Sequence, residues 1–181
     1  LENDKAKTLL YAVTLCNDAY LEHFKETNTY EVIGDPTEGA LVVLAGKAGL
    51  TRLKLEEQFP RVNEIPFDSK RKLITTVHRA VGEHIVYVKG APDELLKLCP
   101  EADKAEILKE NERLASSGLR SLGVAYKTVK GNVNMAELEK GLIFLGLVGM
   151  IDLPRPEVKD AVAICKQAGI EPVMITGDHR L

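Results

Sequence analysis

The spacing of apolar residues at the start of the chain predicts two helices. Apolar side chains in residues 9–16 recur at a helical interval after the polar pair Asn3-Asp4, which is typical of an amphipathic helix. A second helix is expected directly after Asp35, because aspartate is a favoured N-cap and proline, here Pro36, is favoured at the first helical position.

The middle of the chain predicts a β-hairpin and further elements around it. Two segments rich in β-branched residues, 72–79 and 84–89, flank a short connection at 80–83, a length and composition that suit a hairpin. The pattern then predicts a short helix over 91–98, a longer charged helix over 101–117 and a strand over 119–127. These elements indicate an α/β (α+β) fold in which an antiparallel sheet is flanked by helices.

The pattern changes near Gly141. An apolar run is followed by an amphipathic helix over about 156–168 and by a second apolar segment at 172–176, which is the order of a β-α-β unit with parallel strands. We therefore expect two domains, one over residues 1–140 and built on the antiparallel sheet, the other over residues 141–181.

Composition and charge narrow the classes of protein that fit. The 181 residues include 45% hydrophobic ones, enough for a buried core, and the net charge is −3 with dispersed basic residues. A nucleic-acid surface needs a basic face or stripe, so we expect no nucleic-acid partner. The apolar run at 141–151 is too short to span a bilayer, and we expect no direct membrane insertion.

Cysteine and histidine give no sign of a metal centre. The three cysteines, Cys16, Cys99 and Cys165, are far apart and odd in number, which favours reduced thiols in the cytosol over a disulfide framework. The four histidines show no ligand spacing with cysteine or with one another. We expect no metal site made of these side chains.

Two short strings each combine a group that can hold a nucleotide with a backbone that exposes it: Pro66-Phe67-Asp68-Ser69-Lys70-Arg71-Lys72 and Tyr87-Val88-Lys89-Gly90-Ala91-Pro92. The ring of Phe67 can stack on a purine while the basic residues after it face phosphate. Lys89 ends a strand, and Gly90 lets a ligand approach the backbone. The alternative is structural, with Phe67 in the core and Lys89 a solvated strand end.

Pairing in the hairpin would bring these strings together. Antiparallel strands place the segment before Lys72 beside the segment after Lys89, so that Phe67, Lys72 and Lys89 can face one cleft. Glu38 lies in the first turn of the second predicted helix, where negative charge is favourable by itself. It either compensates the helix dipole, or it accepts from an adenine amino group or orients an arginine of the pocket.

Besides the two strings above, the chain contains four further motifs: Gly34-Asp35-Pro36-Thr37-Glu38-Gly39-Ala40-Leu41, Gly118-Leu119-Arg120-Ser121-Leu122, Gly149-Met150-Ile151-Asp152-Leu153-Pro154-Arg155 and Met174-Ile175-Thr176-Gly177-Asp178. The order of these motifs along the chain resembles the cytoplasmic nucleotide-binding domain of P-type cation-transporting ATPases, running into their phosphorylation domain. The resemblance covers nearly the whole chain and is fullest to the calcium-pump branch, although it leaves the cation open.

The resemblance implies a site for ATP with its Mg²⁺ ion. The residues implied to line the ATP site are Glu38, Phe67, Lys72, Lys89, Gly90, Arg120 and Leu122, with Ile74 as an apolar neighbour. Arg120 would contact phosphate, since guanidinium forms forked bonds to it, although an exposed strand arginine is the alternative. Ser69 departs from those calcium pumps that carry arginine there, which puts phosphate contact at that position in doubt.

For residues 141–181 the resemblance implies part of a Rossmann-like phosphorylation domain of haloacid-dehalogenase type. Thr176, Gly177 and Asp178 would form the loop that attends the transferred phosphoryl group, and Asp152 could share that edge, because ligands bind at the carboxyl ends of parallel strands. The implied partners are the rest of the phosphorylation domain, an actuator domain and membrane helices, with this segment on the cytoplasmic side of the membrane.

The chain lacks two strings that the family uses for chemistry. It has neither Asp-Lys-Thr-Gly-Thr, which supplies the aspartate that attacks the γ-phosphate, nor Gly-Asp-Gly-x-Asn-Asp, associated with magnesium. We therefore expect a fragment of a larger pump that binds ATP without turnover. The alternatives are a fragment of a haloacid-dehalogenase-type phosphatase and a non-catalytic regulatory nucleotide-binding module.

Overall fold

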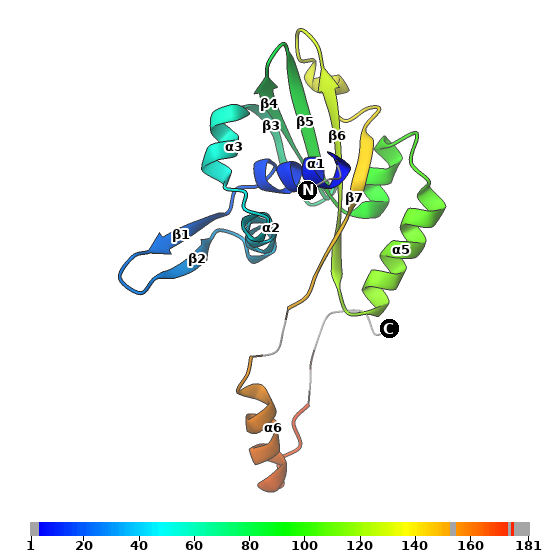
Figure 1. The fold of residues 1–181 in the computed structure, drawn as a ribbon. Coiled ribbons are helices and arrows are strands. Elements are labelled where there is room, and N and C mark those ends of the chain that lie inside the picture. Colours follow the sequence, from blue (N-terminus) through cyan, green and yellow to red (C-terminus); the bar gives the residue numbers. More distant parts are fainter. Residues whose placement is uncertain (1–3, 153–154, 174, 176–181) are drawn as a thin grey trace. The chain divides into compact units, whose positions relative to one another are not determined.

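The computed structural model describes residues 4–152, 155–173 and 175. The chain divides into two compact units, Leu1–Met150 and Ile151–Leu181. Within the described residues the first unit is an α+β fold with a five-stranded sheet and a separate two-stranded sheet (Figure 1). In the part of the second unit that the structure describes there is one helix, α6 (Val158–Gln167).

The large sheet is antiparallel throughout and has the order β3-β4-β5-β6-β7. Its strands are β3 (Arg61–Asp68), β4 (Leu73–Ala80), β5 (Glu83–Gly90), β6 (Arg120–Val129) and β7 (Ile143–Met150). Strands β4 and β5 form the predicted hairpin, in which Ala80 pairs with Glu83. Gly82 has a φ of 79° in the connecting turn, a conformation that glycine adopts without steric cost.

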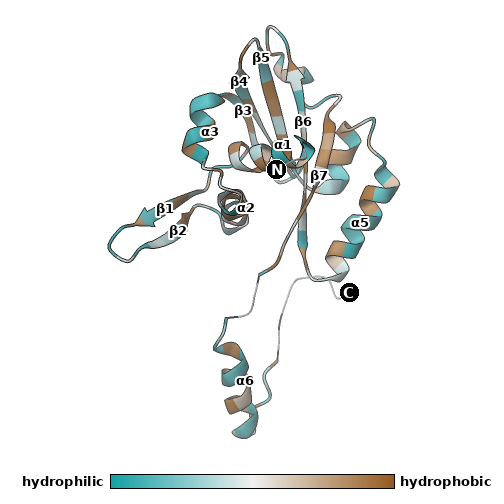
Figure 2. Ribbon diagram, in the orientation of Figure 1, coloured by the Kyte–Doolittle hydropathy of each residue, from teal (hydrophilic) through white to brown (hydrophobic). Residues whose placement is uncertain are grey.

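Helices cover both faces of this sheet. On one face, α1 (Asp4–Leu15), α2 (Pro36–Lys47) and α3 (Arg52–Gln58) bury a core that includes Ile74, Tyr87 and Val124. On the other face, α4 (Pro92–Leu95) and the 3₁₀ turn Leu96–Leu98 pack on a second core, and α5 (Lys104–Ser116) lies beside α4 and β6. Because both faces are covered, the central strands are apolar on both sides, as the colours of β5 show (Figure 2).

Two strands that form a hairpin, a further strand and a helix of the first unit were not predicted. They are the edge strand β3, the helix α3 and the hairpin of β1 (Tyr20–Phe24) and β2 (Thr29–Ile33). The hairpin forms its own sheet beside α2 (Figure 1). Val32 of the hairpin lies against Gly39 of α2. Most residues of β1, β2 and β3 are exposed or half-buried, so their sequences lack the apolar alternation that marks a half-buried strand.

The parallel β-α-β expectation is wrong for the strand that follows Gly141. This strand, β7, pairs antiparallel with β6, with Arg120 opposite Met150, and so belongs to the sheet of the first unit. A strand that is buried on both faces has the same apolar sequence pattern in a parallel and in an antiparallel sheet, which explains the error. Within the described residues of 171–175 there is no second strand. The domain division at 140/141 stays a prediction, although β7 lies in Leu1–Met150.

Candidate functional site

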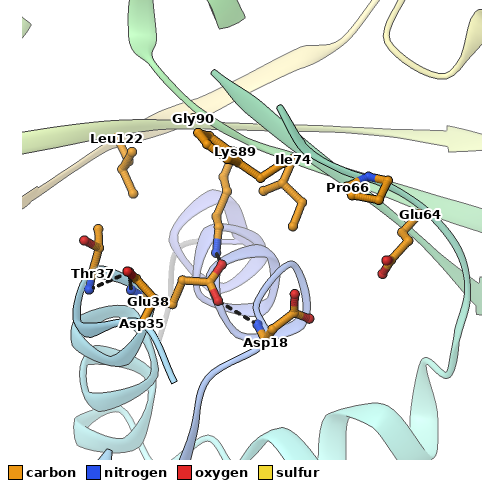
Figure 3. A pocket seen from close by; sticks show the side chains of 11 residues that line it. Asp18, Asp35, Thr37, Glu38, Glu64, Pro66, Ile74, Lys89, Gly90 and Leu122 are labelled. Atoms are coloured by element: carbon orange, nitrogen blue, oxygen red, sulfur yellow. Dashed lines mark hydrogen bonds and ion pairs between the residues drawn. The ribbon is translucent and has the colours of Figure 1, made fainter. Parts of the chain in front are cut away.

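A pocket lies between the N-terminal end of α2 and the sheet face that α1 covers (Figure 3). Its volume is about 520 Å³, within the range of small-molecule and cofactor sites. It is lined by Asp18, Asp35, Thr37, Glu38, Glu64, Pro66, Phe67, Ile74, Lys89, Gly90 and Leu122. Residues from the loop after α1, from α2 and from the four strands β3 to β6 therefore meet at one place.

The start of α2 is fixed by its own sequence. Asp35 is the N-cap, and its Oδ1 accepts hydrogen bonds from the backbone N–H groups of Thr37 at 2.9 Å and Glu38 at 3.2 Å. Pro36 at the first helical position has no N–H that would need a partner. This confirms the predicted cap, and it sets Glu38 in the first turn, directed at the sheet.

Glu38 and Lys89 form a buried ion pair at the centre of the pocket. Lys89 Nζ lies 2.7 Å from Glu38 Oε1, and the two side chains are 5% and 20% exposed. The other oxygen, Glu38 Oε2, accepts a hydrogen bond of 3.0 Å from the backbone N–H of Asp18, as Figure 3 shows. Lys89 is therefore no solvated strand end, and Glu38 does more than compensate a helix dipole.

Hydrogen bonds of the loop after α1 fix the position of the first turn of α2, which carries Glu38. Asn17 Nδ2 donates to the backbone oxygens of Val13 and Glu38, at 3.1 and 2.9 Å, and its Oδ1 accepts from the N–H of Ala19. Asn17 is buried and so links the end of α1 to the first turn of α2. Its bonds fix the position of the neighbouring Asp18 N–H.

Arg61, on β3, donates several hydrogen bonds to the same loop. Its Nη2 donates to the backbone oxygens of Leu15 at 2.9 Å and Asn17 at 2.7 Å. Its Nη1 donates to Asp18 Oδ1 at 2.7 Å and Glu64 Oε2 at 2.9 Å. Burial alone would lower the pKa of Arg61, but these carboxylates outweigh it and raise the pKa above the ordinary arginine value.

Five of the predicted ATP-site residues line the pocket together: Glu38, Phe67, Lys89, Gly90 and Leu122. Phe67 is 61% exposed and is therefore no core residue, so its ring is available to a ligand. The apolar neighbour Ile74 also lines the pocket. Strands β3 to β5 thus bring Phe67 and Lys89 to one cavity, as the strand pairing predicted, but not Lys72, which was expected to face the same cleft.

Gly90 is required by the sheet as well as by the pocket. A Cβ added at this position would lie 2.0 Å from the backbone oxygen of Lys72 and 3.0 Å from the Cα of Leu73. The φ of Gly90 is 156°, which side-chain-bearing residues rarely adopt. The glycine therefore allows the close approach of the β3–β4 turn to the end of β5, a role different from the predicted approach of a ligand.

Lys72 and Arg120 do not line the cavity. Lys72 occupies the β3–β4 turn with a φ of 56°, its N–H donates to Asp68 and its carbonyl accepts from Ala91. Arg120 begins β6 two residues before Leu122 and on the same face of the strand. Arg71, from the basic string, instead pairs with Glu139 and donates to the carbonyl oxygen of Pro66. Thr176, Gly177 and Asp178 lie outside the described residues.

The sequence missed two acidic residues of the lining, Asp18 and Glu64. Neither belongs to a recognisable local pattern, since each reaches the pocket through contacts with Arg61. Of the described lining residues, Asp18, Asp35, Glu38 and Glu64 carry carboxylates and Lys89 alone carries an ammonium group. Such a wall suits a ligand part that donates hydrogen bonds and disfavours a polyanion.

Two further findings concern metals and membranes. Among the described residues, no group of histidine, cysteine and acidic side chains is placed to hold a metal ion. In the same part of the chain, no helix has the length and apolar character needed to cross a bilayer.

Comparison with known proteins finds one matching family and several similar proteins. Residues 5–157 match the protein family described as "P-type ATPase, cytoplasmic domain N". The chain is 42% identical to "Calcium-transporting ATPase 1" of Bacillus cereus, over 99% of this chain and 21% of that protein. It is 46% identical to "Cation-transporting ATPase pma1" of Synechocystis sp., over 91% of this chain and 19% of that protein. The chain thus spans about a fifth of the length of these relatives.

Proposed function

Since this chain belongs to the P-type ATPases and contains their cytoplasmic domain N, we propose that the pocket between α2 and the sheet binds ATP by its adenine base. The observation that carries this proposal is the exposed ring of Phe67 at a cavity whose centre holds the Lys89–Glu38 pair. Aromatic rings stack on purines, and such stacking contributes about 1–3 kcal/mol per base.

The polar groups of the pocket suit an adenine edge. Glu38 can accept a hydrogen bond from the exocyclic amino group, and Lys89 can donate to a ring nitrogen. Both side chains are held by neighbours, Glu38 by the Asp18 N–H and Lys89 by Glu38 itself. Ile74 and Leu122 supply apolar surface beside them, as expected for a site that encloses a base.

The triphosphate would extend out of the cavity, because the wall carries more carboxylates than cations. Arg120 precedes Leu122 by two residues on the same face of β6, so its guanidinium is suitably placed on the strand to meet phosphate beyond the cavity. We assign Lys72 the same role at the β3–β4 turn. The ATP would enter with its Mg²⁺ ion, which neutralises part of the phosphate charge.

In the whole pump, this domain would present the γ-phosphate to an aspartate outside this chain and so drive transport of a cation, with calcium suggested by the names of the relatives. Thr176, Gly177 and Asp178 would attend the phosphoryl group together with the phosphorylation and actuator domains and the membrane helices. Only the segment after β7, which contains α6, would contribute to the Rossmann-like phosphorylation domain. This chain alone should bind ATP without turnover.

The test is a titration of the chain with Mg-ATP, followed by amide chemical shifts. Phe67→Ala should raise the Kd of both ATP and adenosine by about tenfold, because the stacking energy is lost in each. Phe24→Ala is the matched control, since Phe24 is a partly exposed phenylalanine of β1 that does not line the pocket. Absence of saturable shifts in the folded wild-type chain, or equal effects of the two substitutions, would refute the proposal.

A further inference from the structure

The lining of the pocket carries more negative than positive charge. Four carboxylates face one ammonium group among the described lining residues, and Glu38 already holds that ammonium. ATP carries several negative charges, and like charges at close range disfavour binding. A pocket for a nucleotide therefore needs positive charge close behind this wall.

Arg61 supplies such a charge without lining the pocket. Its Nη1 contacts the carboxylates of Asp18 and Glu64, two of the four in the wall, at 2.7 and 2.9 Å. Its side chain is 18% exposed, whereas those of Asp18 and Glu64 are 62% and 44% exposed, so water partly screens these contacts and their effect depends on salt. One guanidinium that does not line the cavity thus offsets part of the charge of two lining residues.

Arg61 also fixes the amide that holds Glu38. The bonds of its Nη2 to the carbonyl oxygens of Leu15 and Asn17 place the loop after α1, and the next N–H in that loop, of Asp18, donates to Glu38 Oε2. These contacts connect β3, the end of α1 and the first turn of α2. The path from Arg61 to the Lys89–Glu38 pair runs through one loop residue.

We propose that Arg61 is a positioning residue for nucleotide binding, which makes an acidic pocket wall compatible with a polyphosphate by compensating Asp18 and Glu64. This inference rests on the proposed function, since it concerns how the same pocket accepts ATP. It assigns a function to a residue that does not line the pocket. It also explains why the carboxylates of Asp18 and Glu64 can border a nucleotide site.

A purely structural role for Arg61 makes a different prediction. If Arg61 only tied α1 to β3, its loss would weaken the binding of every ligand of the pocket equally. If it compensates charge, its loss weakens ATP binding more than adenosine binding, and added salt reduces the difference. The ratio of the two dissociation constants therefore separates the two roles.

The experiment measures the Kd of ATP and of adenosine by calorimetry, at about 20 mM and about 300 mM salt, where screening lengths differ severalfold. For Arg61→Gln we expect ATP binding about fivefold weaker at low salt and adenosine binding changed less than about twofold. Adding Glu64→Gln to this variant should restore most of the ATP affinity, because one uncompensated carboxylate is removed.

Arg52→Gln is the matched control. Arg52 is another partly buried arginine that donates to the carboxylate of Glu56 and to a loop carbonyl, that of Ala19, but Glu56 does not line the pocket. Its loss should change the Kd of ATP and of adenosine by the same factor. Equal factors for Arg61→Gln would overturn the inference.

A second variant keeps the test decisive if Arg61→Gln does not fold. Glu64→Gln in the wild-type background removes one carboxylate and leaves Arg61 in place, so ATP affinity should rise by about threefold at low salt while adenosine affinity is unchanged. An unchanged ATP affinity in this variant would also overturn the inference. If the folded wild-type chain binds adenosine but not ATP, the inference fails; if it binds neither, the proposed function fails.

Discussion

Replacing Lys89 with methionine removes the cation of the buried ion pair while keeping a side chain of similar length. Loss of one partner of a fully buried pair costs about 3–5 kcal/mol, because the other charge remains buried. Glu38 is 20% exposed and keeps the N–H of Asp18 at 3.0 Å, so part of its charge stays solvated. We therefore expect the free energy of unfolding to fall by about 1–2 kcal/mol.

The double variant Lys89→Met with Glu38→Gln separates the pair from its parts. Replacing both charges of a buried pair is often nearly neutral, so this protein should be at least as stable as the less stable single variant. The free energies of unfolding of the four proteins, measured in urea, give the coupling between the two side chains. We expect a coupling of about 1–2 kcal/mol.

The pair of Lys97 and Glu94 provides the comparison. Its nitrogen and oxygen lie 2.6 Å apart, but Lys97 is 65% exposed, and exposed pairs contribute little to stability because water competes for both charges. The same cycle at Lys97 and Glu94 should give a much smaller coupling. If the Lys89–Glu38 coupling is no larger than this one, the buried pair does not organise the pocket and our reasoning is refuted.

Two further predictions concern the sheet beneath the pocket. His78 is fully buried, its Nδ1 donates to the Phe59 carbonyl at 2.9 Å, and burial lowers its pKa to about 4. As the pH falls, His78 takes up its proton at a higher pH in the unfolded chain than in the folded one. The free energy of unfolding should therefore fall by up to about 3 kcal/mol as the pH is lowered from 6.5 to 4. Urea titrations at several pH values should show this slope, and His78→Gln should remove it; an unchanged slope contradicts the assignment. Gly90→Ala should destabilise the fold by about 2–3 kcal/mol, because the new Cβ meets the Lys72 oxygen at 2.0 Å. Gly131→Ala, at a φ of 77° with open space around it, should cost less, and equal thermal shifts for the two would refute the close approach.

Local signals in the sequence were sufficient for much of the fold. Asp35 and Pro36 mark the start of α2, and the β-branched segments around Gly82 mark the hairpin, because caps and turns depend on neighbouring residues alone. The direction of β7 was not accessible in this way. An apolar strand carries no information about which neighbour it pairs with when both faces of the sheet are covered.

The candidate site, like the fold, could be predicted only in part from local signals in the sequence. Of the residues that the motifs predicted to lie together, Glu38, Phe67 and Lys89 line one cavity, whereas Lys72 and Arg120 do not. Arg71 pairs with Glu139 instead of facing the pocket, since a tight turn directs successive side chains to different sides. A run of like charges in the sequence therefore does not establish a phosphate-binding surface.

The contacts that shape the pocket are distant in sequence. Glu38 and Lys89 are 51 residues apart, and Arg61 lies 46 residues from Leu15 and 43 from Asp18. No local pattern predicts such pairs, because each forms only when α1, α2 and the sheet pack together. It follows that these side chains both stabilise the fold and shape the site, so a loss of binding in any one variant is ambiguous. Ratios between ligands of different charge, and coupling energies between paired residues, do not share this ambiguity, because a general loss of stability cancels from both.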